Sequence, residues 1–139
     1  MTDWYVYHSD ETMGRRYGNP EPSCVFGTAE QKKLCLSDDI WVIEGFGESP
    51  KIFYLAAHFV YQKPEYPPFP SPYKGGKYLD FKVMYAGPGS NYESKFKLTF
   101  EDHPWFKELH AKYITKQRFF NEISGLPNVI SGLRALAGL

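Results

Sequence analysis

The chain has 139 residues, about the length of one domain, and we expect residues 1–139 to form a single folded unit. Sixteen basic residues balance 16 acidic ones, which excludes attachment to nucleic acid through bulk positive charge. Hydrophobic residues make up 42% and aromatic residues 18%, enough for a core and for rings that stack on a ligand.

The charges are unevenly distributed along the chain. Residues 1–50 carry four Lys or Arg against nine Asp or Glu, and residues 104–139 carry five against two. A basic strip in the second half could hold a short stretch of nucleic-acid backbone, although an ordinary solvated surface explains the same asymmetry.

Cysteine usage and the N-terminus indicate an intracellular protein. Cys24 and Cys35 form no CxxC pair and are too few for a disulfide framework, so we expect reduced thiols. The first residues lack the pattern of a signal peptide, and no apolar run approaches the roughly 18 residues that span a membrane. We therefore expect a soluble cytoplasmic or nuclear protein without a membrane partner.

The first third of the chain alternates between strand-like and turn-like segments. Residues 4–8 are aromatic and β-branched and predict a strand, whereas residues 14–23 are polar and rich in turn formers. Thr28, followed three residues later by Gln31, is typical of a capping box and predicts a short helix that ends near Leu34.

The middle of the chain predicts a hairpin followed by an unusual loop. Residues 40–43 and 52–60 read as two strands, joined by turn-forming residues 45–50. Residues 64–77 contain five prolines together with Tyr66, Phe69 and Tyr73, and a segment so rich in proline cannot join a central sheet. We expect these three aromatic side chains to face a ligand or a partner.

The last third changes from a strand period to a helical one. Residues 81–85 and 96–100 alternate as strands do, and apolar residues from Trp105 to Tyr113 recur at helical spacing. Pro127 suits the first turn of a last helix that extends to Leu136. The whole pattern predicts a mixed α+β domain without internal repeats.

The motifs of common enzyme classes are absent from the sequence. There is no phosphate-binding loop, no dinucleotide fingerprint, no HExxH, no nucleophile elbow and no zinc deaminase signature. The four histidines show no metal-ligand spacing, His58 lies in an apolar strand, and Asp38 with Asp39 reads as a turn. We therefore expect no catalytic residue, no metal site and no cofactor.

Three segments together resemble the YTH and EVE domains of the PUA-like superfamily. Residues 4–9, Trp-Tyr-Val-Tyr-His-Ser, are similar to a first strand that ends in Lys-Ser in that family. Residues 24–34 are similar to the YTH segment Val-Trp-Ser-Thr and the Lys-Lys-Leu that follows it, and residues 39–43 with 52–60 resemble the family's central hairpin. The resemblance covers about the first 85 residues. It implies a small open β-barrel of about five to six strands, flanked by helices.

The resemblance also implies a function and its residues. Such domains enclose a modified, for example methylated, base in an aromatic cage, taken from single-stranded RNA or flipped out of duplex DNA. Such a domain can be the reader module of a modification-dependent restriction system. Phe26 stands where the family has a cage tryptophan, and Tyr66, Phe69 or Tyr73 would supply the other face of the cage. The further base-contacting candidates are Ser9, Thr28, His8 and Trp41.

Two alternatives remain open from the sequence. A PUA-like nuclease or hydrolase would use His8, Glu44 and His58 if these converge in the barrel. A protein-interaction module would use the proline- and aromatic-rich loop as its contact surface. Neither the base, its modification nor the oligomeric state follows from the sequence.

Overall fold

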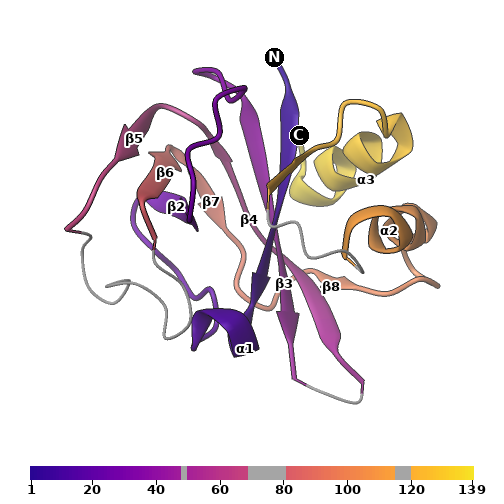
Figure 1. Cartoon of the computed structure of the whole chain (residues 1–139). Helices are drawn as coiled ribbons and strands as arrows, with labels where there is room; N and C mark the ends of the chain where they lie inside the picture. The colour runs from indigo at the N-terminus through magenta and orange to yellow at the C-terminus, as the bar shows by residue number, and fades with distance from the viewer. Residues whose placement is uncertain (48–49, 69–80, 115–119) are drawn as a thin grey trace.

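The computed structural model describes residues 1–47, 50–68, 81–114 and 120–139, and within them the chain is a mixed α+β domain in which strands predominate (Figure 1). These described residues form two sheets, three α-helices and one π-helical segment. Their bounds are β1 Asp3–Ser9, α1 Asp10–Met13, β2 Ser23–Gly27, β3 Asp39–Phe46, β4 Ile52–Val60, β5 Lys63–Glu65, β6 Val83–Gly87, β7 Gly89–Asn91, β8 Lys97–Leu98, α2 Pro104–Leu109, η1 His110–Ile114, β9 Phe120–Glu122 and α3 Pro127–Ala137.

The larger sheet has the strand order β7-β4-β3-β1-β9, and β8 also pairs with β4. β1 and β3 pair in parallel, from Asp3 opposite Asp39 to Ser9 opposite Gly45, and the other pairs are antiparallel. A parallel pair requires a crossover connection, and here that connection contains α1 and β2.

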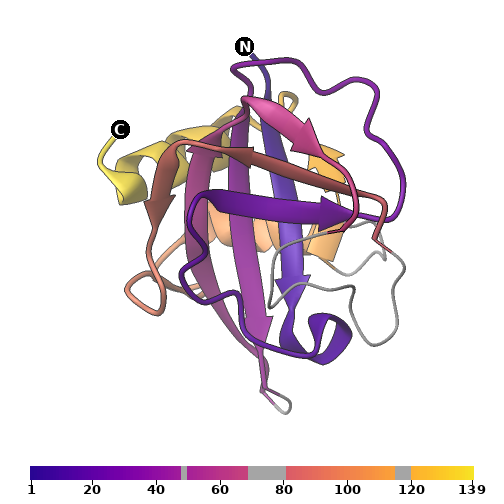
Figure 2. The ribbon, with the colours of Figure 1, turned by 90° about the vertical axis from the view of Figure 1, so that its left-hand side faces the viewer.

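The smaller sheet consists of β2, β6 and β5, all antiparallel, and it crosses one face of the larger sheet (Figure 2). Helices α2 and α3 cover the opposite face of the larger sheet (Figure 1). The α+β class is thus confirmed. The described strands lie in two separate sheets, and no single sheet closes on itself among them.

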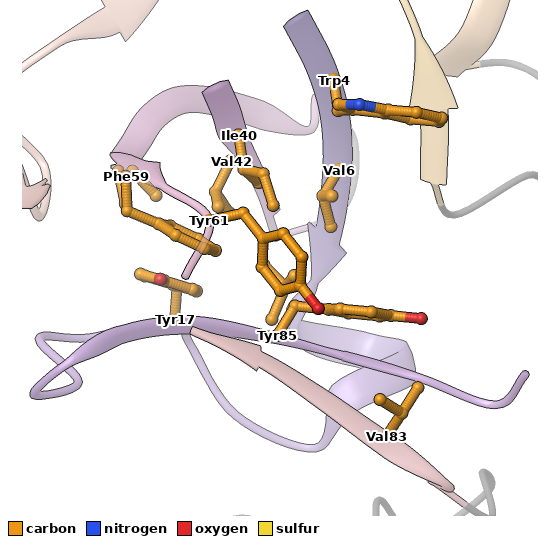
Figure 3. Packing of buried hydrophobic residues seen from close by; sticks show 12 residues of the cluster. Trp4, Val6, Tyr17, Ile40, Val42, Phe59, Tyr61, Val83 and Tyr85 are labelled. Carbon is orange, nitrogen blue, oxygen red and sulfur yellow. The ribbon is translucent and has the colours of Figure 1, made fainter. Parts of the chain in front are cut away.

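One hydrophobic core lies between the two sheets (Figure 3). Trp4 and Val6 of β1 and Val42 of β3 point towards the smaller sheet, which contributes Val83 and Tyr85. These side chains are spaced two residues apart on each strand, because successive side chains of a strand point to opposite faces. All five are at most 2% exposed.

A second core lies between the larger sheet and the helices, with Tyr5 and Trp41 against Phe106 and Leu133 among others. A β-bulge decides which residues of β4 face it. Val42 pairs with Ala57 but Ile43 pairs with Leu55, which leaves Ala56 as the extra residue. Leu55 therefore faces the helices, whereas Ala57 and Phe59 face the smaller sheet.

The main strands and the last helix agree with expectation. β1, the β3–β4 hairpin and α3 occupy the predicted segments, and α3 begins at Pro127. It ends where Gly138 adopts the left-handed conformation (φ 76°) that glycine tolerates without steric cost. The predicted helix of residues 105–113 is present as α2, continued by η1.

The predicted helix between Thr28 and Leu34 is wrong, because this segment forms turns. Neither bond of a capping box forms. The Gln31 N–H donates to the Tyr85 hydroxyl at 2.6 Å, and its Oε1 accepts from the Lys33 N–H at 3.4 Å. The hydrogen bond to Tyr85, a tertiary contact, is therefore favoured over the capping-box hydrogen bonds that would begin a short helix.

The predicted strand 96–100 shrinks to β8, because only Lys97 and Leu98 pair with β4. Thr99 ends it, since its carbonyl accepts the His103 N–H and its hydroxyl accepts the Asp102 N–H. Where the proline-rich segment begins, residues 63–65 form β5 at the edge of the smaller sheet, a position that proline tolerates. Residues 69–77 of that segment lie outside the described residues.

Candidate functional site

A small cavity lies where β1 ends, α1 turns and the edge strand β2 crosses. Two residues expected to contact a base, His8 and Phe26, both line it. The full lining is Val6, His8, Met13, Tyr17, Cys24, Val25 and Phe26. The cavity measures about 10 Å³, which is room for about one water molecule. The cavity is therefore closed to a base unless a wall moves.

His8 supplies the polar part of this lining. It is 4% exposed, its Nε2 lies 2.8 Å from the carbonyl oxygen of Arg15, and its ring meets Tyr17 edge-on at 5.5 Å. Burial lowers the pKa of the imidazole, so the ring is neutral at pH 7. Because a carbonyl only accepts, Nε2 carries the proton and Nδ1 is left as an acceptor.

Phe26 supplies an aromatic wall at the edge of the smaller sheet. Its side chain is 2% exposed and belongs to a third apolar cluster, on the face of β2 and β6 that points away from the larger sheet. There its ring lies 5.5 Å from that of Phe81, and Met13 of α1 and Met84 of β6 belong to the same cluster.

The segment that precedes β2 is tied to both sheets. The Tyr17 hydroxyl donates to the Cys24 carbonyl at 2.9 Å and accepts its N–H at 3.3 Å. The Tyr17 N–H donates to the carboxylate of Glu44, which is 2% exposed, at 2.6 Å. Arg16 pairs with the same carboxylate at 2.8 Å, and its guanidinium lies over the Phe46 ring at 4.3 Å.

The remaining sequence candidates lie at differing distances from this cavity. Ser9 follows His8, is 8% exposed and caps α1 without a side-chain hydrogen bond. Thr28 is exposed directly after β2, and the exposed Tyr66 donates its hydroxyl hydrogen to Glu30 at 2.6 Å. Phe69 and Tyr73 lie outside the described residues.

Trp41 lies apart from the cavity, in the core beneath the helices. It is fully buried, its Nε1–H donates to Asp3 at 2.9 Å, and its ring lies 4.1 Å from that of His58. His58 itself contacts Asp39, with Nε2 2.8 Å from the carboxylate. His58 therefore does not converge with His8 and Glu44, which are neighbours across β1 and β3.

Sequence reasoning did not identify Met13, Tyr17 or Cys24 as lining residues. Tyr17 is an isolated aromatic residue in a polar stretch, the one local signal that it anchors the segment. Burial raises the pKa of the Cys24 thiol to about 12, so it remains protonated and is a poor nucleophile. The lining thus offers a neutral imidazole, a protonated thiol and apolar walls.

Comparison with known proteins identifies no relative, since no family model, no curated protein and no solved structure matches the chain. Within the described ranges, no three His, Cys, Asp or Glu side chains are grouped so as to hold a metal ion. No helix of the described chain has the length and apolar character needed to cross a membrane.

Proposed function

We propose that this chain is a nucleic-acid-binding domain of the PUA-like, YTH or EVE type that receives one modified base in the cavity between β1, α1 and β2. The observation that carries the proposal is that His8 and Phe26, 18 positions apart, line one cavity. One brings a hydrogen-bond acceptor and the other an aromatic ring. In this proposal the two crossed sheets are the open barrel of that superfamily.

The two residues match the two requirements of a base. Stacking on an aromatic ring contributes about 1–3 kcal/mol per base, and Phe26, which packs against Phe81, would provide that surface. The edge of a base needs polar partners, and Nδ1 of His8 would accept an N–H from it. A methyl group on the base would contact the side chain of Met13, which lines the cavity with Phe26.

Entry of a base requires α1 to move, because the cavity now holds only about one water molecule. α1 has four residues, and the backbone bond from Gly14 N–H to the Asp10 carbonyl closes its single turn. A helix this short has little stability of its own. Displacing it, and with it Met13, would open the cavity beside Phe26, at a cost that lowers the observed affinity.

The test is fluorescence-anisotropy binding to matched short oligonucleotides, unmodified or carrying N6-methyladenine or 5-methylcytosine, as single strands and duplexes. The informative variant is His8→Gln, because glutamine keeps a donor for the Arg15 carbonyl but removes the acceptor at Nδ1. His110→Gln is the matched control, since His110 also has a pKa lowered by burial but packs against Phe53 and Phe100 on the helix side.

We expect one modified probe to bind about tenfold more tightly than its unmodified partner, equal to about 1.4 kcal/mol. His8→Gln should remove that difference and His110→Gln should keep it. Equal affinity for modified and unmodified probes, or no binding at low salt, would refute the proposal. Thermal melts of both variants show whether a lost response is a loss of folding.

A further inference from the structure

A second and much larger pocket opens at the other end of β1. Its volume is about 330 Å³, within the usual range of small-molecule sites. The lining residues are Trp4, Gln31, Lys33, Tyr113, Phe120, Asn121 and Glu122, none of which lines the first cavity. Trp4 and His8 lie on the same face of β1, four residues apart, which places the two pockets about 13 Å from each other along the strand.

Hydrogen bonds hold the walls of this pocket in place. The loop between β2 and β3, residues 28–38, forms one wall of the pocket. Asp38 at its end accepts the Trp4 indole N–H at 2.9 Å and the Cys35 N–H at 2.9 Å, which fixes that end of the loop against β1. Nearer its start, the Gln31 N–H donates to the Tyr85 hydroxyl. The pocket therefore exists without a ligand, and binding would not require ordering of this loop.

The side chains of the pocket offer three different kinds of recognition. The half-buried Phe120 ring, supported by Trp4 at 5.3 Å and Tyr85 at 5.4 Å, offers an aromatic surface. Gln31 carries an amide, whose donor and acceptor groups match a base edge. Lys33 brings an ammonium group that pairs with no acid among the described residues.

Glu122 narrows the choice of ligand. Its carboxylate balances the charge of Lys33 in the lining, so a bare anion gains little there. A carboxylate accepts hydrogen bonds from an amino group, as in recognition of the amino group of cytosine. A ligand that satisfies both residues carries an anionic group and an amino-bearing edge on the same molecule.

We propose that this pocket binds a nucleotide whose base carries an amino group. The base lies against Phe120, its edge contacts Gln31 and Glu122, and its phosphate contacts Lys33. The ligand is either a free mononucleotide or one nucleotide of a strand, and both present the same chemistry. The site does not depend on base modification or on the first cavity.

The experiment is a ¹⁵N–¹H NMR titration of the full chain with cytidine monophosphate, uridine monophosphate, inorganic phosphate and a short unmodified oligocytidine. Lys33→Glu and Glu122→Gln test the site. Lys107→Glu, an exposed lysine on α2, is the control for general charge effects. The side-chain N–H signal of Trp4, identified with Trp4→Phe, reports on the pocket wall.

We expect cytidine monophosphate, the oligocytidine or both to shift the Trp4 signal, with binding at least fivefold weaker in Lys33→Glu and unchanged in Lys107→Glu. Glu122→Gln should reduce the preference for cytidine over uridine. A response to the oligonucleotide alone identifies a strand as the source of the ligand. Equal responses to inorganic phosphate and nucleotide, or no response to any probe, would overturn the proposal.

The His8→Gln variant distinguishes the proposal for the first cavity from the proposal for the second pocket. It should leave this titration unchanged while it removes the methyl dependence of binding at the first cavity. The failure of one proposal is therefore visible without the failure of the other.

Discussion

Replacing Asp38 with asparagine tests whether one buried carboxylate anchors the loop after β2 to the sheet. The Asp38 side chain is 2% exposed and accepts three hydrogen bonds. Thr2 N–H donates to Oδ1 at 3.0 Å, and the Trp4 indole and Cys35 N–H donate to Oδ2 at 2.9 Å each. Asparagine has the same shape but only one acceptor atom, so at least one donor loses its partner.

The expected cost follows from these contacts. A hydrogen bond to a charged group contributes about 1.5–3 kcal/mol net and a neutral one about 0.5–1.5 kcal/mol. In Asp38→Asn, the two bonds at the former Oδ2 position become neutral and lose about 1 kcal/mol each, and the bond from Thr2 is lost. We therefore expect the free energy of unfolding at pH 7 to fall by about 3 kcal/mol.

The pH dependence supplies an independent check. Burial by itself raises the pKa of Asp38, but the hydrogen bonds from Cys35, Thr2 and Trp4 outweigh it, and the pKa is lowered in the folded state. The carboxylate therefore stabilises the fold fully above its unfolded pKa of about 3.9, and this contribution is lost as the pH falls further. The difference between wild type and Asp38→Asn should shrink below about pH 4.

Urea denaturation followed by circular dichroism at pH 7 and pH 3 measures both effects. Asp102→Asn is the control, because Asp102 is exposed and a surface change of this kind shifts stability by no more than about 0.5 kcal/mol. A loss below about 1 kcal/mol at pH 7, or a difference that does not change with pH, would refute the reasoning.

Two further predictions concern a helix contact and the thiols. Gly132→Ala should destabilise the protein by about 1–3 kcal/mol in a thermal melt, because the new Cβ would lie 2.3 Å from Nε1 of the Trp105 ring. The cost of this steric clash exceeds the gain in helix propensity from glycine to alanine. Gly125→Ala, with nothing within 4 Å, is its control, and equal melting temperatures would contradict the contact. Titration of the folded protein with a thiol reagent at pH 8 should modify the exposed Cys35 rapidly and the buried Cys24 only after denaturant is added. Rapid reaction of both thiols in the folded protein would contradict the burial of Cys24.

The elements with a strong hydrophobic period were predictable from the sequence. In β1 and β3 the side chains alternate between two apolar faces, and α3 presents Val129 and Leu133 on one face. These signals are local, because a period of two or of 3.6 residues is visible within one segment. The resemblance to modified-base readers singled out His8 and Phe26, and their role in binding a base remains a prediction.

The short elements were not predictable. β5, β7 and β9 have three residues each and carry no periodic signal. They are strands only because β6, β4 and β1 offer them backbone partners. The helix expected after Thr28 failed for the related reason that Tyr85, far along the chain, offered Gln31 a better partner than the local backbone.

The sequence by itself determined the composition class, the main strands of the larger sheet and the last helix, because each depends on spacing within one segment. Tertiary structure alone decided that Trp41 lies beneath the helices while His8 borders a cavity. It also decided that, because of the bulge at Ala56, Leu55 faces the helices and Ala57 faces the smaller sheet. The physical reason is that both faces of the larger sheet are apolar. Which face a residue occupies, and what covers it, depends on the crossing of the second sheet and the docking of the helices, which no single segment encodes.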